Sequence, residues 1–350
     1  FAPESIEISE IKSAISGLSN QVHDLSLVIG GKKIIGGGKK VSVQLPHRKS
    51  EEYAVISLPN ISEVQAVLEN SLAVRSDWAK TSVVERAEIF EKIADLIEFK
   101  YKNLLVAATM IGQSKTVFQG EIDAAAGLID AIRFNTKFAL DIEKMQPPET
   151  EITNISMDYR PLEGFVYSIT PFNFTTTAAI LSTAPALMGN VVIWKPSITA
   201  MLPAHILMDI YKEAGLPDGV INLVPGYGPE VSEVLLANEY LAGIYFTGST
   251  KVFRQLWQQV GNNLGNYRNF PRLVGETGGK GFVIAHPSAD RDRLISALIR
   301  SGFEYQGQKC SACSRAYIPQ SVWNDIKEKL VSEIASMNVG QVEEFKNFMG

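Results

Sequence analysis

The sequence predicts an α/β protein built on a doubly wound parallel sheet, followed by the start of a second α/β domain. Two observations predict this fold class. After residue 148, short runs rich in Val, Ile and aromatic residues alternate with helical stretches, an arrangement typical of parallel strands joined by crossover helices. The chain also has 350 residues, 45% of them apolar, which is enough for two domains with their own cores.

Ahead of the alternating region, the sequence predicts a helical block that ends near residue 145. Ser62 with Gln65, and Ser82 with Glu85, have the spacing of capping boxes, which satisfy free amides at a helix start. Apolar residues at intervals of three and four predict one buried face; they are Val83, Ala87, Phe90, Ala94 and Ile97. The stretch 30–40 predicts strand and turn, since it lacks the residue order of a phosphate-binding loop.

The alternating region is expected to contain five strands separated by four helices. The strands are expected at 165–170, 191–194, 221–224, 243–246 and 282–285. The helices are expected at 176–188, 203–214, 230–237 and 251–260. Ligands of doubly wound sheets bind at the carboxyl ends of the strands, so functional residues should follow these strands directly.

Composition and charge exclude several classes of function. Thirty-three basic and 38 acidic residues give a net charge of −5, which is unlike a nucleic-acid-binding protein. The longest apolar stretch, 178–194, is interrupted by polar residues, proline and glycine, so no membrane span is predicted. Two cysteines cannot form a disulfide framework, and the four histidines are scattered, so we expect a reducing compartment and no metal site.

Four segments after the expected strands carry the chemistry-bearing residues. They are 168–174, 194–197, 246–250, and the pair 275–280 with 307–313. In this order they resemble the motifs of the aldehyde dehydrogenase superfamily. Pro-Phe-Asn-Phe-Thr, Gly-Glu-Thr-Gly-Gly-Lys and Gly-Gln-Lys-Cys-Ser-Ala-Cys-Ser-Arg are most similar to its Δ1-pyrroline-5-carboxylate dehydrogenase group. The likeness extends from about residue 60 to residue 350.

The resemblance implies NAD-dependent oxidation of glutamate γ-semialdehyde, a small molecule, to glutamate in proline breakdown. It implies a location in the mitochondrial matrix, or in the cytoplasm if the protein is bacterial, and a homo-oligomer that is a dimer or is built from dimers. It further implies that residues 1–275 form an N-terminal segment and a Rossmann-like NAD-binding domain. Residues 276–350 would begin a catalytic domain that is truncated here, because family members are longer.

Three residues have side chains suited to aldehyde oxidation. Cys310 is the candidate nucleophile, because a thiolate adds readily to an aldehyde carbon. The amide of Asn173, with the backbone N–H of Cys310, is expected to stabilise the oxyanion, and Glu276 is the candidate base that activates water. Each has a plainer interpretation: an inert core cysteine or a C-x-x-C pair with Cys313, a turn asparagine, and a surface or helix-capping glutamate.

The cofactor segment departs from the usual dinucleotide fingerprint. The turn 173–176 stands where G-x-G-x-x-G would be expected. By resemblance, Lys195 contacts the adenosine ribose hydroxyls and Thr170 lies near the cofactor. Five residues open a helix whose amides and short hydroxyl suit a pyrophosphate, although they also suit a simple helix cap; they are Gly248, Ser249, Thr250, Lys251 and Val252.

Substrate selection is only partly predicted. Ser311, next to Cys310, is expected to donate to the substrate carboxylate, and Phe172 and Phe174 either line an aliphatic channel or pack in the core. Gly127 stands where the family usually has glutamate, which leaves recognition of the substrate amino group open. The alternative functions are a dehydrogenase for another aldehyde and a catalytically inactive NAD-binding fragment.

Overall fold

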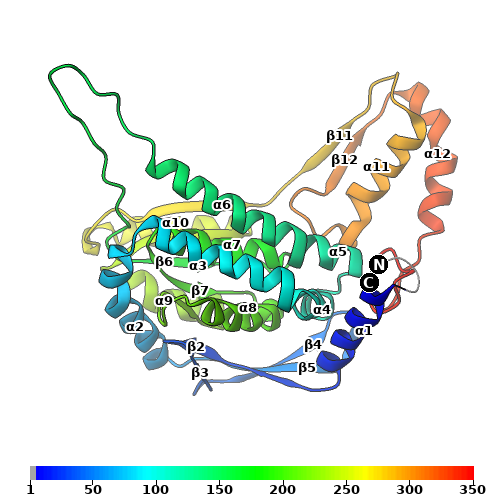
Figure 1. Ribbon diagram of the computed structural model, residues 1–350. Helices are drawn as coiled ribbons and strands as arrows, with labels where there is room; N and C mark the ends of the chain where they lie inside the picture. Colours follow the sequence, from blue (N-terminus) through cyan, green and yellow to red (C-terminus); the bar gives the residue numbers. More distant parts are fainter. Residues whose placement is uncertain (1–4) are drawn as a thin grey trace.

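The computed structural model describes residues 5–350, and its centre is a seven-stranded sheet (Figure 1). In spatial order the strands are β10 (Arg272–Thr277), β9 (Leu241–Gly248), β6 (Phe165–Ile169), β7 (Val191–Lys195), β8 (Ile221–Leu223), β2 (Leu27–Ile29) and β3 (Lys32–Ile34). The first five are parallel, whereas β2 and β3 form an antiparallel hairpin that pairs with β8. Every residue of β6 and β7 is buried, as expected for central strands covered by helices on both faces.

Helices connect the parallel strands in the doubly wound manner that the sequence predicts. The connecting helices are α7 (Thr175–Leu187), α8 (Met201–Ala214), α9 (Gly228–Ala237) and α10 (Thr250–Asn262), with short 3-10 turns η3 (Ile198–Ala200) and η4 (Leu264–Asn266). The chain moves across the sheet in one direction from β6 to β8, and then crosses back in the other direction to β9 and β10. Because such crossovers are right-handed, α7 and α8 cover one face of the sheet and α9 and α10 cover the other. Helix α2 (Ile61–Lys80) packs against β7 and α9.

The predicted helical block contains five helices with two π-helical turns between them. After α2 come α3 (Val83–Leu96), η1 (Ile97–Tyr101), α4 (Lys102–Gln113), α5 (Val117–Glu121), η2 (Ile122–Gly127) and α6 (Leu128–Glu143). The predicted apolar stripe of α3 and η1 is confirmed, with side chains at most 8% exposed. The segment 144–164 then extends away from the body as a long loop (Figure 1).

One of the two predicted capping boxes is wrong. Ser82 and Glu85 cap α3 as expected. Helix α2, however, begins after Asn60, whose side chain accepts the backbone N–H of Glu63, while Ser62 lies inside the helix. Asparagine is as strong an N-cap as serine, and Asn60 with Glu63 has the same spacing of three residues. The earlier of two competing caps therefore starts the helix.

The N-terminal segment contributes to two sheets. Helix α1 (Ile6–Ser19) is followed by strands β1 (His23–Leu25), β4 (Lys40–Leu45) and β5 (Arg48–Ser57), which form a separate sheet in the order β1-β5-β4. The expected strand and turn in the stretch 30–40 is confirmed, because β3 follows a turn of Gly30 and Gly31, whose φ angles are +54° and +70°. The pairing of β2 with β8 was not predicted.

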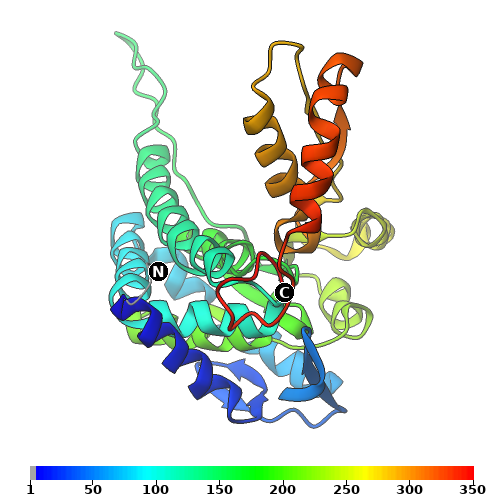
Figure 2. The same cartoon turned by 90° about the vertical axis from the view of Figure 1, so that its right-hand side faces the viewer.

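Residues 281–335 form a lobe with an apolar cluster of its own (Figure 2). It consists of β11 (Gly281–Ile284), α11 (Arg291–Phe303), the 3-10 turn η5 (Glu304–Gly307), β12 (Cys313–Tyr317) and α12 (Gln320–Ala335). The strand expected at 282–285 is present as β11, which pairs with β12 and not with the main sheet. The main sheet ends at β10, which was not among the expected strands. The domain division at 275 and 276 stays a prediction.

Within residues 5–350, no helix is long and apolar enough to cross a membrane.

Candidate active site

The predicted functional segments meet at the carboxyl edge of the main sheet. Asn173 follows β6, Lys195 is the last residue of β7, Gly248 is the last residue of β9, and Glu276 lies near the end of β10. Strand β9 is paired with both β6 and β10. Between β6 and β9 the connections leave the sheet toward opposite faces, and this switch point is where ligands of doubly wound sheets bind.

Asn173 is joined directly to the loop that carries Cys310. Its side-chain Nδ2 donates a hydrogen bond of 2.9 Å to the backbone carbonyl of Gln308, which is 135 residues away in the chain. The backbone N–H of Gln308 donates in turn to the carbonyl of Tyr305 at 3.0 Å. Because a carboxamide has two N–H donors, the bond to Gln308 fixes the group and leaves a second N–H for an oxyanion formed beside Cys310.

The strand that carries Glu276 approaches Cys310 through two glycines. Gly278 and Gly279 have φ angles of +69° and +140°. A Cβ at Gly279 would collide with the backbone carbonyl oxygen of Cys310. The chain therefore runs from Glu276 directly to the backbone beside Cys310. Both side chains are exposed, and Glu276 lies in a strand, so the interpretation of Glu276 as a helix cap is wrong.

Lys195 is buried and retains a free donor. The residue is only 7% exposed. Its Nζ donates to the carbonyl oxygens of Gly226 at 3.1 Å and Pro196 at 3.4 Å. Burial lowers the pKa of this ammonium to about 8. An ammonium has three donors, so one remains for a ligand hydroxyl. The burial of Lys195 is unlike that of a solvated surface lysine.

Thr170 links the ends of β6 and β7. Its hydroxyl accepts a 2.9 Å hydrogen bond from the indole N–H of Trp194, and its backbone N–H donates to the carbonyl of Lys195 at 3.1 Å. Because Trp194 uses the hydroxyl as an acceptor, Thr170 can offer a ligand its carbonyl or its hydroxyl proton. Its position beside Lys195 keeps it among the candidate cofactor residues.

The predicted pyrophosphate segment opens helix α10 at the end of β9. Ser249 is the N-cap, and its Oγ accepts the backbone N–H of Val252 at 3.2 Å. The hydroxyl of Thr250 donates to that of Thr277 on β10 at 3.2 Å. Gly248 is half-buried, whereas the side chains of Ser249 through Val252 are exposed. Ser249 caps only one of the free amides in the first turn of α10, so another remains available to an anion. This geometry is therefore compatible with both interpretations of the segment, as a helix cap and as an anion contact.

The candidate substrate residues differ in exposure and in packing. Ser311 is exposed directly after Cys310. Gly127 lies at the end of η2, where a Cβ would stand 2.7 Å from the backbone carbonyl oxygen of Ile122 and 3.6 Å from the hydroxyl oxygen of Thr176 in the first turn of α7. Phe172 is 47% exposed. Phe174 instead packs edge-to-face on Tyr305, with ring centroids 6.4 Å apart, so core packing accounts for that ring.

The two cysteines are both free thiols. Cys313 donates weakly to the carbonyl of Arg315 at 3.2 Å. Across the described part of the chain, no three His, Cys, Asp or Glu side chains gather in a way that could hold a metal ion.

The sequence matches the model of a known protein family. A model of the aldehyde dehydrogenase family matches residues 35–350. The chain belongs to the aldehyde dehydrogenase family. Its parallel sheet with helices on both faces is the fold of that family.

Relatives that are 43–49% identical to this chain are named for Δ1-pyrroline-5-carboxylate. The mitochondrial Δ1-pyrroline-5-carboxylate dehydrogenases of Dictyostelium discoideum and Homo sapiens are 45% and 43% identical over 97% and 99% of this chain. The crystal structure of Δ-pyrroline-5-carboxylate dehydrogenase from Mycobacterium tuberculosis bound with NAD is 49% identical, with a TM-score of 0.98 over 100% of this chain. The chain spans 61%, 62% and 65% of the lengths of these three proteins.

Behind the Asn173 turn, the chain has a buried ion pair that the sequence analysis missed. The Nζ of Lys115 lies 2.7 Å from Oδ2 of Asp123, and the two side chains are 0% and 1% exposed. Burial lowers the pKa of Lys115, an effect that the charge of Asp123 opposes. The signal in the sequence is a lysine directly after the apolar end of one helix and an aspartate beside three alanines in the next.

The loop that precedes Cys310 has strained backbone. Among the described residues, those other than glycine with positive φ are Ser114, Tyr305 and Gln306, at 54°, 52° and 54°. All three line one cavity of about 330 Å³, to which Phe172 and Gln308 also contribute. Such strain persists only where the surrounding structure imposes it, and it is concentrated at functional sites. The cavity therefore adjoins the candidate active site.

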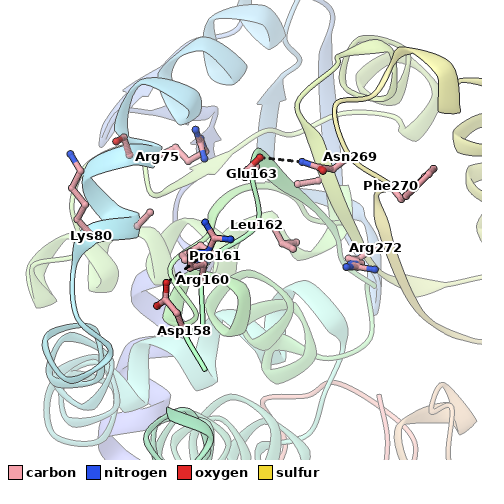
Figure 3. Close-up of a pocket in the computed structure, with 13 residues that line it drawn as sticks. Arg75, Lys80, Asp158, Arg160, Pro161, Leu162, Glu163, Asn269, Phe270 and Arg272 are labelled. Carbon is pink, nitrogen blue, oxygen red and sulfur yellow. Dashed lines mark hydrogen bonds and ion pairs between the residues drawn. The ribbon is translucent and has the colours of Figure 1, made fainter. Parts of the chain in front are cut away.

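A second hollow, of about 680 Å³, lies at the opposite edge of the sheet (Figure 3). Its walls include Arg75, Arg160 and Arg272, and a 3.3 Å hydrogen bond joins Asn269 to Glu163 across it. It lies near the start of β10, whereas Glu276 lies near the end of that strand. None of the predicted site residues contributes to it.

Proposed function

We propose that this protein oxidises glutamate γ-semialdehyde, the open form of Δ1-pyrroline-5-carboxylate, to glutamate with NAD as the oxidant. The observation that carries the proposal is the convergence of Asn173 and of the Gly279 backbone on the loop that contains Cys310. This convergence brings a thiol, an oxyanion donor and a carboxylate to one edge of the sheet. The relatives named for Δ1-pyrroline-5-carboxylate support the choice of substrate.

The first step forms a covalent bond to the enzyme. The thiolate of Cys310 attacks the aldehyde carbon, and the carbonyl electron pair moves onto oxygen. The oxyanion accepts the free N–H of the Asn173 amide, which the carbonyl of Gln308 holds in place, together with the backbone N–H of Cys310. A donor fixed before the reaction stabilises the new charge without having to reorient.

The residues present fit a dinucleotide at the switch point of the sheet. Lys195 has an unused donor in a buried position at the end of β7, and the first turn of α10 presents amides at the end of β9. Lys195 donates to ribose hydroxyls, Thr170 lies beside it, and residues 248–252 receive the pyrophosphate. Bound NAD would accept the hydride that leaves the tetrahedral carbon, so that a thioester remains on Cys310.

The second step releases the acid. The carboxylate of Glu276 removes a proton from a water molecule, and the hydroxide formed adds to the thioester carbon. The C–S bond then breaks with its electron pair on sulfur, the carboxylic acid leaves, the Cys310 thiolate is restored, and Glu276 releases its proton to solvent. The exposed position of Glu276 gives water direct access to it. Ser311 donates to the substrate carboxylate, and the side of the site near Gly127 contributes no acidic group from that position.

The proposed location follows the names of the relatives, whereas the proposed assembly rests on the family resemblance alone. Proteins printed as mitochondrial are among the relatives, and the Mycobacterium tuberculosis enzyme is bacterial. We therefore place the protein in the mitochondrial matrix in a eukaryote and in the cytoplasm in a bacterium, as a dimer or an assembly of dimers. The step belongs to proline degradation.

A pre-steady-state experiment on the whole protein tests the proposal. Glu276→Gln should reduce one equivalent of NAD in a rapid burst and then stall, because the thioester is not hydrolysed at a useful rate. Cys310→Ala should give neither burst nor turnover. Stopped-flow absorbance of NADH follows the burst, and intact-protein mass spectrometry detects the acyl group on Cys310.

A panel of aldehydes identifies the substrate, and the other outcomes show which part of the proposal would be wrong. A panel of aldehydes with NAD should show the highest kcat/KM for glutamate γ-semialdehyde; a higher value for another aldehyde would replace the substrate and keep the chemistry. If Glu276→Gln binds NAD but shows neither burst nor adduct, Glu276 acts before hydride transfer and its assignment here is wrong. If the unaltered protein oxidises no aldehyde, the proposed activity is wrong.

A further inference from the structure

Lys115 is fully buried, yet no step of the proposed reaction uses it. It lies in the connection between α4 and α5, and its partner Asp123 lies in the π-helical turn η2. Replacing a buried ion pair by apolar residues is often neutral or stabilising, so such a pair is weak grounds for inferring a role in stability. The contacts around Lys115 indicate what else it does.

On one side, the pair holds the start of helix α7. The carboxylate of Asp123 accepts the backbone N–H groups of Thr175 at 2.8 Å and Thr176 at 2.9 Å. The hydroxyl of Thr176 also donates to the backbone carbonyl of Asp123. These bonds fix the two residues that follow Asn173 and Phe174 in the chain. The turn η2 is therefore tied to the start of α7, directly after the segment that carries Asn173.

On the other side, the ammonium of Lys115 lies between two rings. Its Nζ is 4.1 Å from the ring centroid of Phe174 and 4.6 Å from that of Tyr305. Phe174 belongs to the Asn173 turn, whereas Tyr305 begins the strained part of the loop that leads to Cys310. A cation over two aromatic faces is attracted to both. Lys115 thus joins the same two segments that the hydrogen bond from Asn173 to Gln308 joins.

We propose that Lys115 is a positioning residue, whose ammonium, anchored by Asp123 and placed between the rings of Phe174 and Tyr305, holds the Asn173 amide and the Cys310 loop in their reactive arrangement. The proposal rests on the proposed function for its kinetic consequences. An apolar side chain of the same length fills the same space but has no charge to attract the carboxylate and both rings. The effect of Lys115 is therefore expected in kcat.

The first test replaces the charge and keeps the length. In the whole protein, Lys115→Met should lower kcat by about 10–100-fold, the range caused by small displacements of reacting groups, with little change in the Kd for NAD. The matched control is Lys102→Met, which breaks the 2.7 Å ion pair from Lys102 to Glu121 in the neighbouring turn, where both side chains are partly exposed. That control should leave kcat unchanged.

A double-mutant cycle separates positioning from general destabilisation. If Lys115 acts by placing the Asn173 amide, Lys115→Met should lower kcat much less in an Asn173→Ala background than in the unaltered protein, because the group it places is already absent. Equal effects in both backgrounds would overturn the proposal. So would an unchanged kcat in Lys115→Met, or a loss of activity that parallels only a loss of folded protein measured by circular dichroism.

Amide hydrogen exchange tests the proposal without any substrate. Lys115→Met should increase exchange in the segments 173–177 and 303–310 together, whereas Lys102→Met should change neither. Unchanged exchange in both segments would overturn the proposal. If the unaltered protein oxidises no aldehyde, the proposed function fails, and the exchange result still decides whether Lys115 holds the two segments.

Discussion

Asn173 shows how one side chain can have two tasks. One of its N–H groups is bound to the carbonyl of Gln308, and the other is free to stabilise an oxyanion. Removing the amide therefore removes a donor from the reaction and also a tie to the Cys310 loop. Because one hydrogen bond joins Asn173 to the Cys310 loop, a substitution at Asn173 tests the oxyanion donor and the position of that loop together.

Asn173→Ala should lower kcat by about 10²–10³-fold, the usual effect of losing one oxyanion donor, while the Kd for NAD stays nearly unchanged. Steady-state kinetics and a fluorescence titration with NAD measure the two quantities. Asn269→Ala, at the hollow on the opposite edge of the sheet, is the matched control and should leave both values as they are. A normal kcat in Asn173→Ala would remove this residue from the mechanism.

Lys195 should make NAD binding depend on pH. Burial lowers its pKa to about 8, so the ammonium loses its proton as the pH rises through that value. Charge-assisted hydrogen bonds are stronger than neutral ones, so the protonated form should bind the ribose hydroxyls more tightly. The Kd for NAD should be flat below pH 8 and should increase above it.

Calorimetric titrations between pH 6.5 and 9.5 measure this dependence, and binding near pH 8 should be accompanied by proton uptake. Lys195→Met should weaken binding and flatten the profile. A Kd that falls with rising pH would contradict the assignment, because it would mean that the neutral amine is the better ligand.

At the scale of elements, two helix starts compete at the beginning of α2. The side chain of Asn60 accepts from the backbone N–H of Glu63, and Ser62 only donates to that same side chain at 2.7 Å. Asn60→Ala should therefore lower the free energy of unfolding by about 1 kcal/mol, whereas Ser62→Ala should lower it by a few tenths at most. Urea denaturation measures both. A larger effect for Ser62→Ala would mean that the helix begins where the sequence pattern first placed it.

The connection between β10 and β11 is the element on which the site depends most. Gly279→Ala adds a methyl group that collides with the Cys310 carbonyl, at a φ of +140° that alanine rarely adopts. We expect kcat to fall by about 10²-fold because the thiol is displaced, while NAD binding persists. Gly261→Ala is the control, since no atom lies within 4 Å of its added carbon. Parallel kinetics and NAD titrations of the two variants distinguish a local displacement from a general defect.

For the whole molecule, the buried His205 should make the free energy of unfolding depend on pH in the acid range. It is buried on α8, its Nε2 lies 2.6 Å from the carbonyl oxygen of Ser26, and burial lowers its pKa to about 4. The unfolded chain binds this proton near pH 6.5, so the stabilising effect of the neutral ring is complete above that pH and is lost as the pH falls toward 4. The loss amounts to about 3 kcal/mol.

Urea denaturation at several pH values tests this. His205→Gln should weaken the dependence between pH 6.5 and 4, whatever its effect at neutral pH. An unchanged slope in that variant would assign the acid sensitivity to other groups.

The parts of the fold that depend on local pattern could be predicted from the sequence. Most strands and helices after residue 148 lie within two residues of their expected bounds, because Val, Ile and aromatic runs alternate there with amphipathic stretches. Strand β10 was missed because Arg272, Gly275 and Glu276 give it no apolar pattern at the exposed edge of the sheet. The pairing of β11 with β12 depends on residues far apart in the chain, which no local pattern encodes.

The candidate site divides in the same way. Cys310, Glu276, Asn173 and Lys195 could be proposed because each lies in a short motif after a strand or in a loop. The pair of Lys115 and Asp123 could not, because its meaning comes from the rings of two other segments. In a sequence, a buried charged residue is seen only as an interruption of an apolar pattern. The interruption does not show which residue the charge pairs with.

The hairpin of β2 and β3 is synthesised long before the strand β8 with which it pairs. Val28 pairs with Leu223, which leaves the ribosome about 195 residues later, or roughly 10–40 s later at ordinary rates of synthesis. Throughout that interval the hairpin has no β8 to pair with, so its edges are open to other chains. Lys32 and Lys33 lie on β3, and charged lysines on an edge strand oppose such pairing. These lysines protect the edge of β3 both in the nascent chain and in the finished sheet, whereas the edge of β2 is covered only once β8 has been made.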